Sequence, residues 1–218
     1  ANFNGSRRLW YETFKDIEGN FTTSKLFSTE ANIGERSCYN MNLQGALKQY
    51  FGYDAFRPGQ EEIIGNIING KDVVAILPTG MGKSLCYQLP GYLLQKPVLI
   101  VSPLLSLMQD QVDQLKQMGE KRVVALNSFL TMEQKKYALH FLQEYRFIFV
   151  SPEMLLQPQV KARIQEMELS LIVADEAHCI SQWGFDFRPD YLRIGEVLPE
   201  SNRPPILALS ATATDSVL

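Results

Sequence analysis

Short apolar segments alternate with segments of helical periodicity over most of the chain. The apolar segments are four or five residues long and rich in β-branched side chains, which is typical of buried strands. They lie at 73–77, 98–101, 123–126, 147–150, 171–174 and 206–209. Between them, apolar residues recur every three or four positions, as on one face of a helix. The helices predicted in this way cover 83–94, 104–118, 132–144 and 153–167, the last with an interruption at Pro158. The alternation predicts an α/β fold, a mostly parallel sheet with helices on both faces.

Two further helical patterns precede the first strand. One begins after Asn42, and the other follows the sequence Phe-Arg-Pro-Gly-Gln at 56–60, with Pro58 near its first turn. Residues 1–40 differ from the rest because they are rich in Asn, Ser, Thr and Gly and their apolar residues are scattered. We therefore expect an N-terminal extension of unknown role at 1–40, with a short helix at 6–17, and a compact domain at 41–218.

Composition narrows the class of protein. The net charge is −3, so binding to nucleic acid would need a local patch. The three cysteines, Cys38, Cys86 and Cys179, have no zinc-site spacing and suggest no disulfide framework, which indicates a reducing compartment. No apolar segment reaches the roughly 18 residues of a membrane helix, so no membrane association is expected.

A glycine-containing loop follows the first apolar strand. Its sequence is Pro-Thr-Gly-Met-Gly-Lys-Ser at 78–84, and a helix is predicted directly after it. Glycines let the backbone bend around phosphate groups, Lys83 supplies positive charge, and the Ser84 hydroxyl is a Mg²⁺ ligand type. The match to G-x-x-x-x-G-K-[ST] is incomplete because Leu77 replaces the first glycine. A chance glycine-rich turn is the alternative.

Two adjacent carboxylates follow the strand at 171–174. Asp175 and Glu176 stand at its carboxyl end, where alternating side chains point in different directions. One carboxylate can hold Mg²⁺ while the other polarises a water molecule for attack on a phosphate. The alternative is an exposed acidic turn. His178, two residues later, is either a packing histidine or a link from the nucleotide site to another part of the molecule.

Two later segments carry residues suited to coupling. Ser210 and Thr212 follow the last strand in a sequence of small residues, which suits a switchable hydrogen-bonding turn or a plain polar loop. The segment 181–191 contains four aromatic residues and Arg188. Aromatic rings stack on bases and arginine pairs with phosphate, although such a segment can also fold into a local core.

Five motifs of the sequence resemble, in their order along the chain, the motifs of superfamily 2 helicases. They lie at 56–60, 79–84, 102–108, 175–178 and 210–212. With the aromatic-rich segment, residues 42–218 resemble the first RecA-like lobe of a RecQ-family DNA helicase. The resemblance implies a P-loop NTPase fold, and this superfamily does not require a glycine at the position of Leu77.

The resemblance also implies cofactors and residue roles. ATP and Mg²⁺ would be the cofactors, with Ser84 and Asp175 serving the metal. Glu176 would activate the attacking water, and Lys83, Asp175, Glu176 and His178 would form the catalytic set. Nucleotide binding would involve Arg57, Gln60, Thr79, Gly80, Met81, Gly82, Lys83 and Ser84. DNA contact and its coupling to ATP would involve Ser102, Ser151, Trp183, Phe185, Phe187, Arg188, Ser210 and Thr212.

The implied function is 3′–5′ translocation on single-stranded DNA and duplex unwinding in DNA repair and recombination. The implied partners are DNA and the family's second RecA-like lobe, which supplies an arginine finger and has no counterpart in residues 1–218. We therefore expect this chain to be part of a motor, located in the cytoplasm with the nucleoid if bacterial and in the nucleus if eukaryotic. Protein partners cannot be inferred. The alternatives are another superfamily 2 remodelling or RNA-directed ATPase, a catalytically silent DNA- or protein-binding module, and a small-molecule P-loop kinase.

Overall fold

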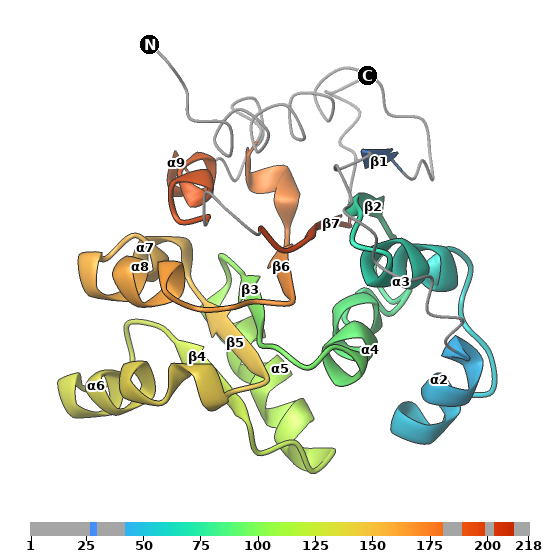
Figure 1. The fold of residues 1–218 in the computed structure, drawn as a ribbon, viewed down its shortest axis with the longest axis horizontal. Helices are drawn as coiled ribbons and strands as arrows, with labels where there is room; N and C mark the ends of the chain where they lie inside the picture. The colour runs from blue at the N-terminus through green and yellow to red at the C-terminus, as the bar shows by residue number, and fades with distance from the viewer. Residues whose placement is uncertain (1–26, 30–41, 181–188, 199–202, 212–218) are drawn as a thin grey trace.

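The fold is that of a computed structural model, which describes residues 27–29, 42–180, 189–198 and 203–211 (Figure 1). The helix expected at 6–17 lies outside these residues. None of the described helices is long and apolar enough to cross a membrane.

The described residues form one seven-stranded sheet with helices packed against it. Its strands are β1 (Phe27–Thr29), β2 (Asp72–Ile76), β3 (Val98–Val101), β4 (Val123–Leu126), β5 (Phe147–Val150), β6 (Leu171–Ala174) and β7 (Ile206–Ser210). The spatial order is β1-β2-β7-β6-β3-β5-β4, and every neighbouring pair from β2 to β4 is parallel. The predicted mostly parallel sheet is confirmed. The sequence did not predict β1, which pairs antiparallel with β2 from within the expected extension.

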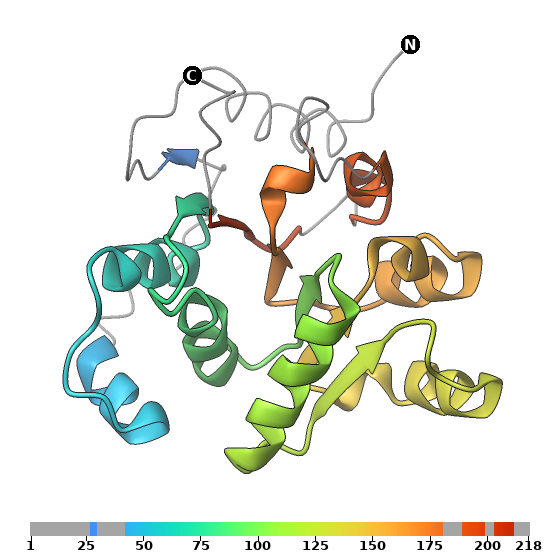
Figure 2. The same cartoon turned by 180° about the vertical axis from the view of Figure 1, so that it is seen from behind.

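Helices lie on both faces of the sheet, as Figures 1 and 2 show from opposite sides. They are α2 (Leu43–Phe51), α3 (Gln60–Ile68), α4 (Leu85–Leu93), α5 (Leu105–Gln117), α6 (Met132–His140), α7 (Pro152–Leu155), α8 (Pro158–Gln165) and α9 (Pro189–Leu192). Short 3-10 helices are η2 (Leu142–Glu144), η3 (Ala177–Ile180) and η4 (Ile194–Glu196).

Successive residues of each strand pack into opposite cores. In β3, Leu99 and Val101 pack on the side of α6, α8 and α9, whereas Val98 and Ile100 pack on the side of α3, α4 and α5. Burial on both faces explains why the strands are apolar throughout instead of alternating with polar residues. Because the six parallel strands point the same way, the loops after β2, β6 and β7 share one edge of the sheet.

The observed helix limits match the predicted ones only in part. The interruption predicted at Pro158 is confirmed, because the segment 153–167 forms two helices, α7 and α8, and Pro158 begins α8, where proline fits the first turn of a helix. The helix expected at 132–144 ends at His140 and continues as η2. The helix α3, for which the sequence set no exact limits, begins at Gln60, two residues after Pro58, because the left-handed φ of 84° at Gly59 is incompatible with a right-handed helix.

Candidate nucleotide-binding and hydrolysis site

The loop between β2 and α4 has the backbone of an anion-binding turn. Gly80 and Gly82 have φ values of 82° and 75°, in the left-handed region that favours glycine. A Cβ atom on Gly82 would lie 2.8 Å from the side-chain nitrogen of Gln60, so space as well as conformation requires glycine there. The helix α4 begins at Leu85, later than predicted, because Lys83 and Ser84 remain in this turn.

The loop presents backbone N–H donors that have no acceptor among the residues that the structure describes. Within the described part of the chain, the backbone N–H groups of Gly80, Gly82, Lys83 and Ser84 donate to no protein acceptor. Ser84 is the N-cap of α4, yet its hydroxyl does not cap the helix. Several N–H groups without a described acceptor at a helix N-terminus, next to a lysine, fit the oxygens of a polyphosphate.

Two residues predicted to bind the nucleotide hold this loop directly. The side-chain amide of Gln60, which is 2% exposed, donates to the carbonyl oxygens of Met81 and Gly82, each at 3.0 Å. Its oxygen accepts from the Arg57 N–H at 2.9 Å, and the Arg57 guanidinium donates to the Gly80 carbonyl. The start of α3 is therefore tied to the loop. Thr79 lies in the same turn, and no described side-chain contact gives it a role.

A pocket of about 650 Å³ adjoins the loop, a size typical of small-molecule sites. It is lined by Phe51, Tyr53, Asp54, Ala55, Arg57, Gln60, Gly82, Ser84, Leu85, Gln88, Gln114, Gln117 and Met118. The sequence alone assigned no role to Tyr53, a 58% exposed aromatic residue, or to the glutamines of α4 and α5. The position of Tyr53, four residues before Arg57, was the available signal for it. The glutamines carried none, because α5 is distant in sequence.

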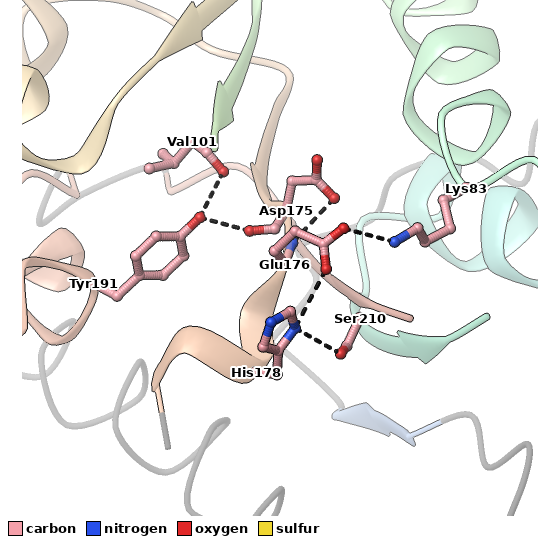
Figure 3. Close-up of polar contacts among 7 residues, drawn as sticks. All are labelled: Lys83, Val101, Asp175, Glu176, His178, Tyr191 and Ser210. Atoms are coloured by element: carbon pink, nitrogen blue, oxygen red, sulfur yellow. Dashed lines mark hydrogen bonds and ion pairs between the residues drawn. The ribbon is translucent and has the colours of Figure 1, made fainter. Parts of the chain in front are cut away.

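The two carboxylates diverge, although for a different reason than strand alternation. The strand β6 ends at Ala174, and Glu176 has a φ of 53°, which non-glycine residues rarely adopt. The Asp175 carboxylate, largely buried, accepts from the Glu176 N–H at 3.0 Å. A left-handed turn thus sends the Glu176 carboxylate away from that of Asp175, towards the loop after β2 (Figure 3).

The Glu176 carboxylate contacts two side chains, one from the loop after β2 and one from η3. One carboxylate oxygen lies 2.9 Å from the Lys83 ammonium, and the other lies 3.3 Å from Nδ1 of His178. The same His178 nitrogen is 3.3 Å from the Ser210 hydroxyl at the end of β7 (Figure 3). The structure therefore brings Lys83 and Ser210, both distant in sequence, to the turn that carries Glu176 and His178.

The pKa values of this cluster follow its contacts. Burial, together with the charge of Glu176, raises the pKa of Asp175 to about 6. The hydrogen bond to His178, reinforced by Lys83, lowers the pKa of Glu176 to about 2. Hydrogen bonds to Cys179 and Glu176 raise the pKa of His178 to about 10. At neutral pH, Glu176 is therefore ionised and His178 is positively charged.

The residues at this edge fit a magnesium ion bound together with phosphate. The described residues contain no cluster of three or more His, Cys, Asp or Glu side chains that could form an all-protein metal site. Mg²⁺ normally needs only one or two protein oxygens, because phosphate oxygens and water complete its octahedron. The uncommitted Ser84 hydroxyl and the Asp175 carboxylate are oxygen ligands of that kind.

Of the residues predicted to contact DNA, two serines are buried and most of the others lie outside the described part of the chain. Ser102 and Ser151 are only 2% and 1% exposed. The Ser151 hydroxyl accepts from the Met154 N–H at 3.4 Å and caps α7, which gives it a structural role. Trp183, Phe185, Phe187, Arg188 and Thr212 lie outside the described residues. Their DNA contacts, and those of the two serines, stay predictions.

Comparison with known proteins identifies the family. The DEAD/DEAH box helicase family profile matches residues 57–218. The chain belongs to this family. Curated relatives of this helicase domain include the "Probable ATP-dependent DNA helicase RecS" of Bacillus subtilis, 54% identical over 81% of the chain, and the ATP-dependent DNA helicase RecQ of Haemophilus influenzae, 44% identical over 77%. The similarity to RecQ-family helicases expected from the motifs is confirmed.

The helicase domain spans only part of these relatives. It covers 36% of the length of RecS and 27% of RecQ. Among solved structures, an ATP-dependent RNA helicase from Sulfolobus tokodaii, described as hypothetical, has a TM-score of 0.62, 23% identity, and coverage of 81% of this chain and 53% of its own. The helicase MrfA bound to DNA and AMPPNP has a TM-score of 0.58, 19% identity, and coverage of 94% and 31%. At these identities the structural likeness establishes the RecA-like fold alone.

Proposed function

We propose that residues 41–218 are the ATP-binding motor lobe of a RecQ-like 3′–5′ DNA helicase, which couples ATP hydrolysis to movement along single-stranded DNA during repair and recombination. The observation that carries the proposal is the meeting of Lys83, Glu176 and His178 beside a loop of unused N–H donors. RecS and RecQ, both named as ATP-dependent DNA helicases, support the choice of DNA. A silent binding module would not need to retain this cluster.

Each part of the site has a task in ATP hydrolysis. The pocket beside Arg57 and Gln60 takes the adenine, and the loop 79–84 takes the phosphates. Ser84 and Asp175 would hold Mg²⁺, which would supply positive charge beside the phosphates. Glu176 orients and polarises the attacking water. His178 connects that carboxylate to Ser210, and so to the turn assigned to coupling.

The ion pair between Lys83 and Glu176 links nucleotide binding to the basicity of the Glu176 carboxylate. Phosphate oxygens compete with the Glu176 carboxylate for the Lys83 ammonium, 2.9 Å away. Once Lys83 turns to the phosphates, Glu176 loses one of the two contacts that hold its pKa near 2. A carboxylate with fewer positive partners is a stronger base, so hydrolytic competence follows binding.

The test is the ATPase activity of the full-length protein with and without single-stranded DNA, in the parent and in Glu176→Gln. The amide keeps the shape of the side chain but cannot accept the proton, so the variant should bind ATP and lose turnover. Glu133→Gln, the same change at an exposed position on α6, is the matched control and should behave like the parent. Turnover near the parent rate in Glu176→Gln would refute its role. Equal stimulation by RNA and DNA would favour the RNA-directed alternative.

A further inference from the structure

Tyr191 connects α9 to the strand ends that carry the candidate site. Its side chain is fully buried, at 0% exposure. Its hydroxyl lies 2.5 Å from the carbonyl oxygen of Asp175 and 3.1 Å from that of Val101 (Figure 3). Val101 is the last residue of β3, and Asp175 directly follows β6. One phenol therefore contacts the ends of two neighbouring strands.

The Asp175 carbonyl depends on this contact more than the Val101 carbonyl does. The Val101 oxygen already accepts from the Asp175 N–H at 2.9 Å. Within the described part of the chain, the Tyr191 hydroxyl is the one donor to the Asp175 oxygen. A phenol hydroxyl has a single proton to donate. The shorter contact identifies the Asp175 carbonyl oxygen as its main acceptor.

The orientation of the Asp175 carbonyl bears directly on Glu176. This carbonyl belongs to the peptide group that joins the two residues, so its direction is tied to the φ torsion of Glu176. That torsion, 53°, is unfavourable for a residue with a Cβ atom. The same turn points the Glu176 carboxylate at Lys83 and His178. A buried hydrogen bond and a left-handed residue have opposing free energies of similar size, so one can offset the other.

We infer that Tyr191 is a positioning residue for ATP hydrolysis, which holds the Asp175–Glu176 peptide so that Glu176 faces the phosphate-binding loop. The inference rests on the proposed function, because Glu176 must be the residue that activates water. Tyr191 is assigned no direct part in the proposed chemistry. It acts through one peptide group and determines where the carboxylate stands.

The first experiment measures ATP hydrolysis by the full-length protein carrying Tyr191→Phe, which removes only the hydroxyl. We expect kcat to fall about tenfold, with KM for ATP within about twofold of the parent, because binding uses the other loop. Tyr87→Phe is the matched control, since Tyr87 is also buried and its hydroxyl bonds to Gln111 at 3.1 Å between α4 and α5. It should leave kcat and KM unchanged. In a Glu176→Gln background, Tyr191→Phe should cause no further loss.

The second experiment needs no activity and uses the 218-residue chain. Amide hydrogen exchange at Glu176 and Cys179, whose N–H groups bond within this turn, should be faster in Tyr191→Phe and unchanged in Tyr87→Phe. Unchanged exchange would overturn the inference even if hydrolysis fell. Faster exchange with an unchanged kcat would overturn it equally. If the parent protein did not hydrolyse ATP, the proposed function would fail, and the positioning of Glu176 for hydrolysis with it, whereas the exchange data would still show whether Tyr191 holds the turn.

Discussion

The carboxylate of Asp175 lies in an environment that disfavours its ionised form. It is 9% exposed and adjacent to another carboxylate, and both facts contribute to its raised pKa. Keeping this carboxylate ionised in the folded state lowers the free energy of unfolding. A neutral side chain in its place would not have this effect. The same carboxylate is the one proposed to serve Mg²⁺, so the site exchanges stability for function.

This cost predicts a pH-dependent effect of Asp175→Asn. The pKa rises from its ordinary value of 3.8 to about 6 in the folded chain. A raised pKa means that the folded state binds the proton more tightly, so the penalty is small below pH 4 and complete above pH 6. Asp175→Asn should therefore stabilise the chain by about 1–3 kcal/mol at pH 8 and change little at pH 4.

Thermal unfolding at the two pH values, without nucleotide or Mg²⁺, measures this effect. The amide can still accept the hydrogen bond from the Glu176 N–H, so local geometry should be retained. Asp110→Asn, on the exposed side of α5, is the control and should shift Tm equally little at both pH values. If Asp175→Asn had a lower Tm than the parent at pH 8, the prediction would be contradicted. Neighbouring groups would then stabilise the buried charge.

Between elements, a buried ion pair joins the beginnings of β2 and β7. The two terminal nitrogens of Arg203 lie 3.0 and 2.7 Å from the two carboxylate oxygens of Asp72, which is 2% exposed. Asp72 also accepts from the Ile206 N–H at 2.9 Å. This pairing lies at the opposite end of the strands from the phosphate-binding loop, and it fixes the two strands next to one another.

Arg203→Met should therefore destabilise the chain strongly. The substitution leaves the Asp72 carboxylate buried without its cation, which typically costs about 3–5 kcal/mol. Arg193→Met removes an exposed ion pair with Glu196, 3.2 Å away, and should destabilise the chain far less, because water screens exposed charges. Chemical denaturation of both variants makes the comparison. Equal losses would mean that water reaches Asp72 and that the pair contributes no more than a surface contact.

For the whole molecule, the prediction concerns the chain assayed by itself. The family resemblance places an arginine finger on the second lobe, and such a finger typically contributes about 10³–10⁵ in rate. Stepping along DNA also needs two lobes that open and close around the nucleotide. We expect the 218-residue chain to bind adenine nucleotide weakly and unwind no duplex. Its ATP hydrolysis should be at least about a thousandfold slower than that of a two-lobed protein.

A fluorescent duplex with a 3′ single-stranded tail, incubated with the purified chain and ATP–Mg, measures unwinding directly. The full-length protein under the same conditions is the positive control. Unwinding by the monomeric chain would show that a second lobe is dispensable and that the two-lobe account is wrong for this protein.

The sequence by itself determined the strands of the parallel sheet, the presence of helices between them, and the family. Segments such as 98–101 and 147–150 predicted strands correctly because burial on both faces requires apolar residues at every position. The glycine-containing loop proposed to bind phosphate was visible because its two glycines, Lys83 and Ser84 are consecutive or nearly so. Features of this kind depend on neighbouring residues, and a linear pattern records them.

Only the tertiary structure decided which of these pieces meet. It placed β7 between β2 and β6, added β1, and brought Lys83 to Glu176 across 93 positions. It also set the left-handed turn at Glu176, the hydrogen bonds of Tyr191, and the burial of Ser102 and Ser151. No periodicity reports these contacts, because each depends on the packing free energy of segments that are distant in sequence and adjacent only after folding.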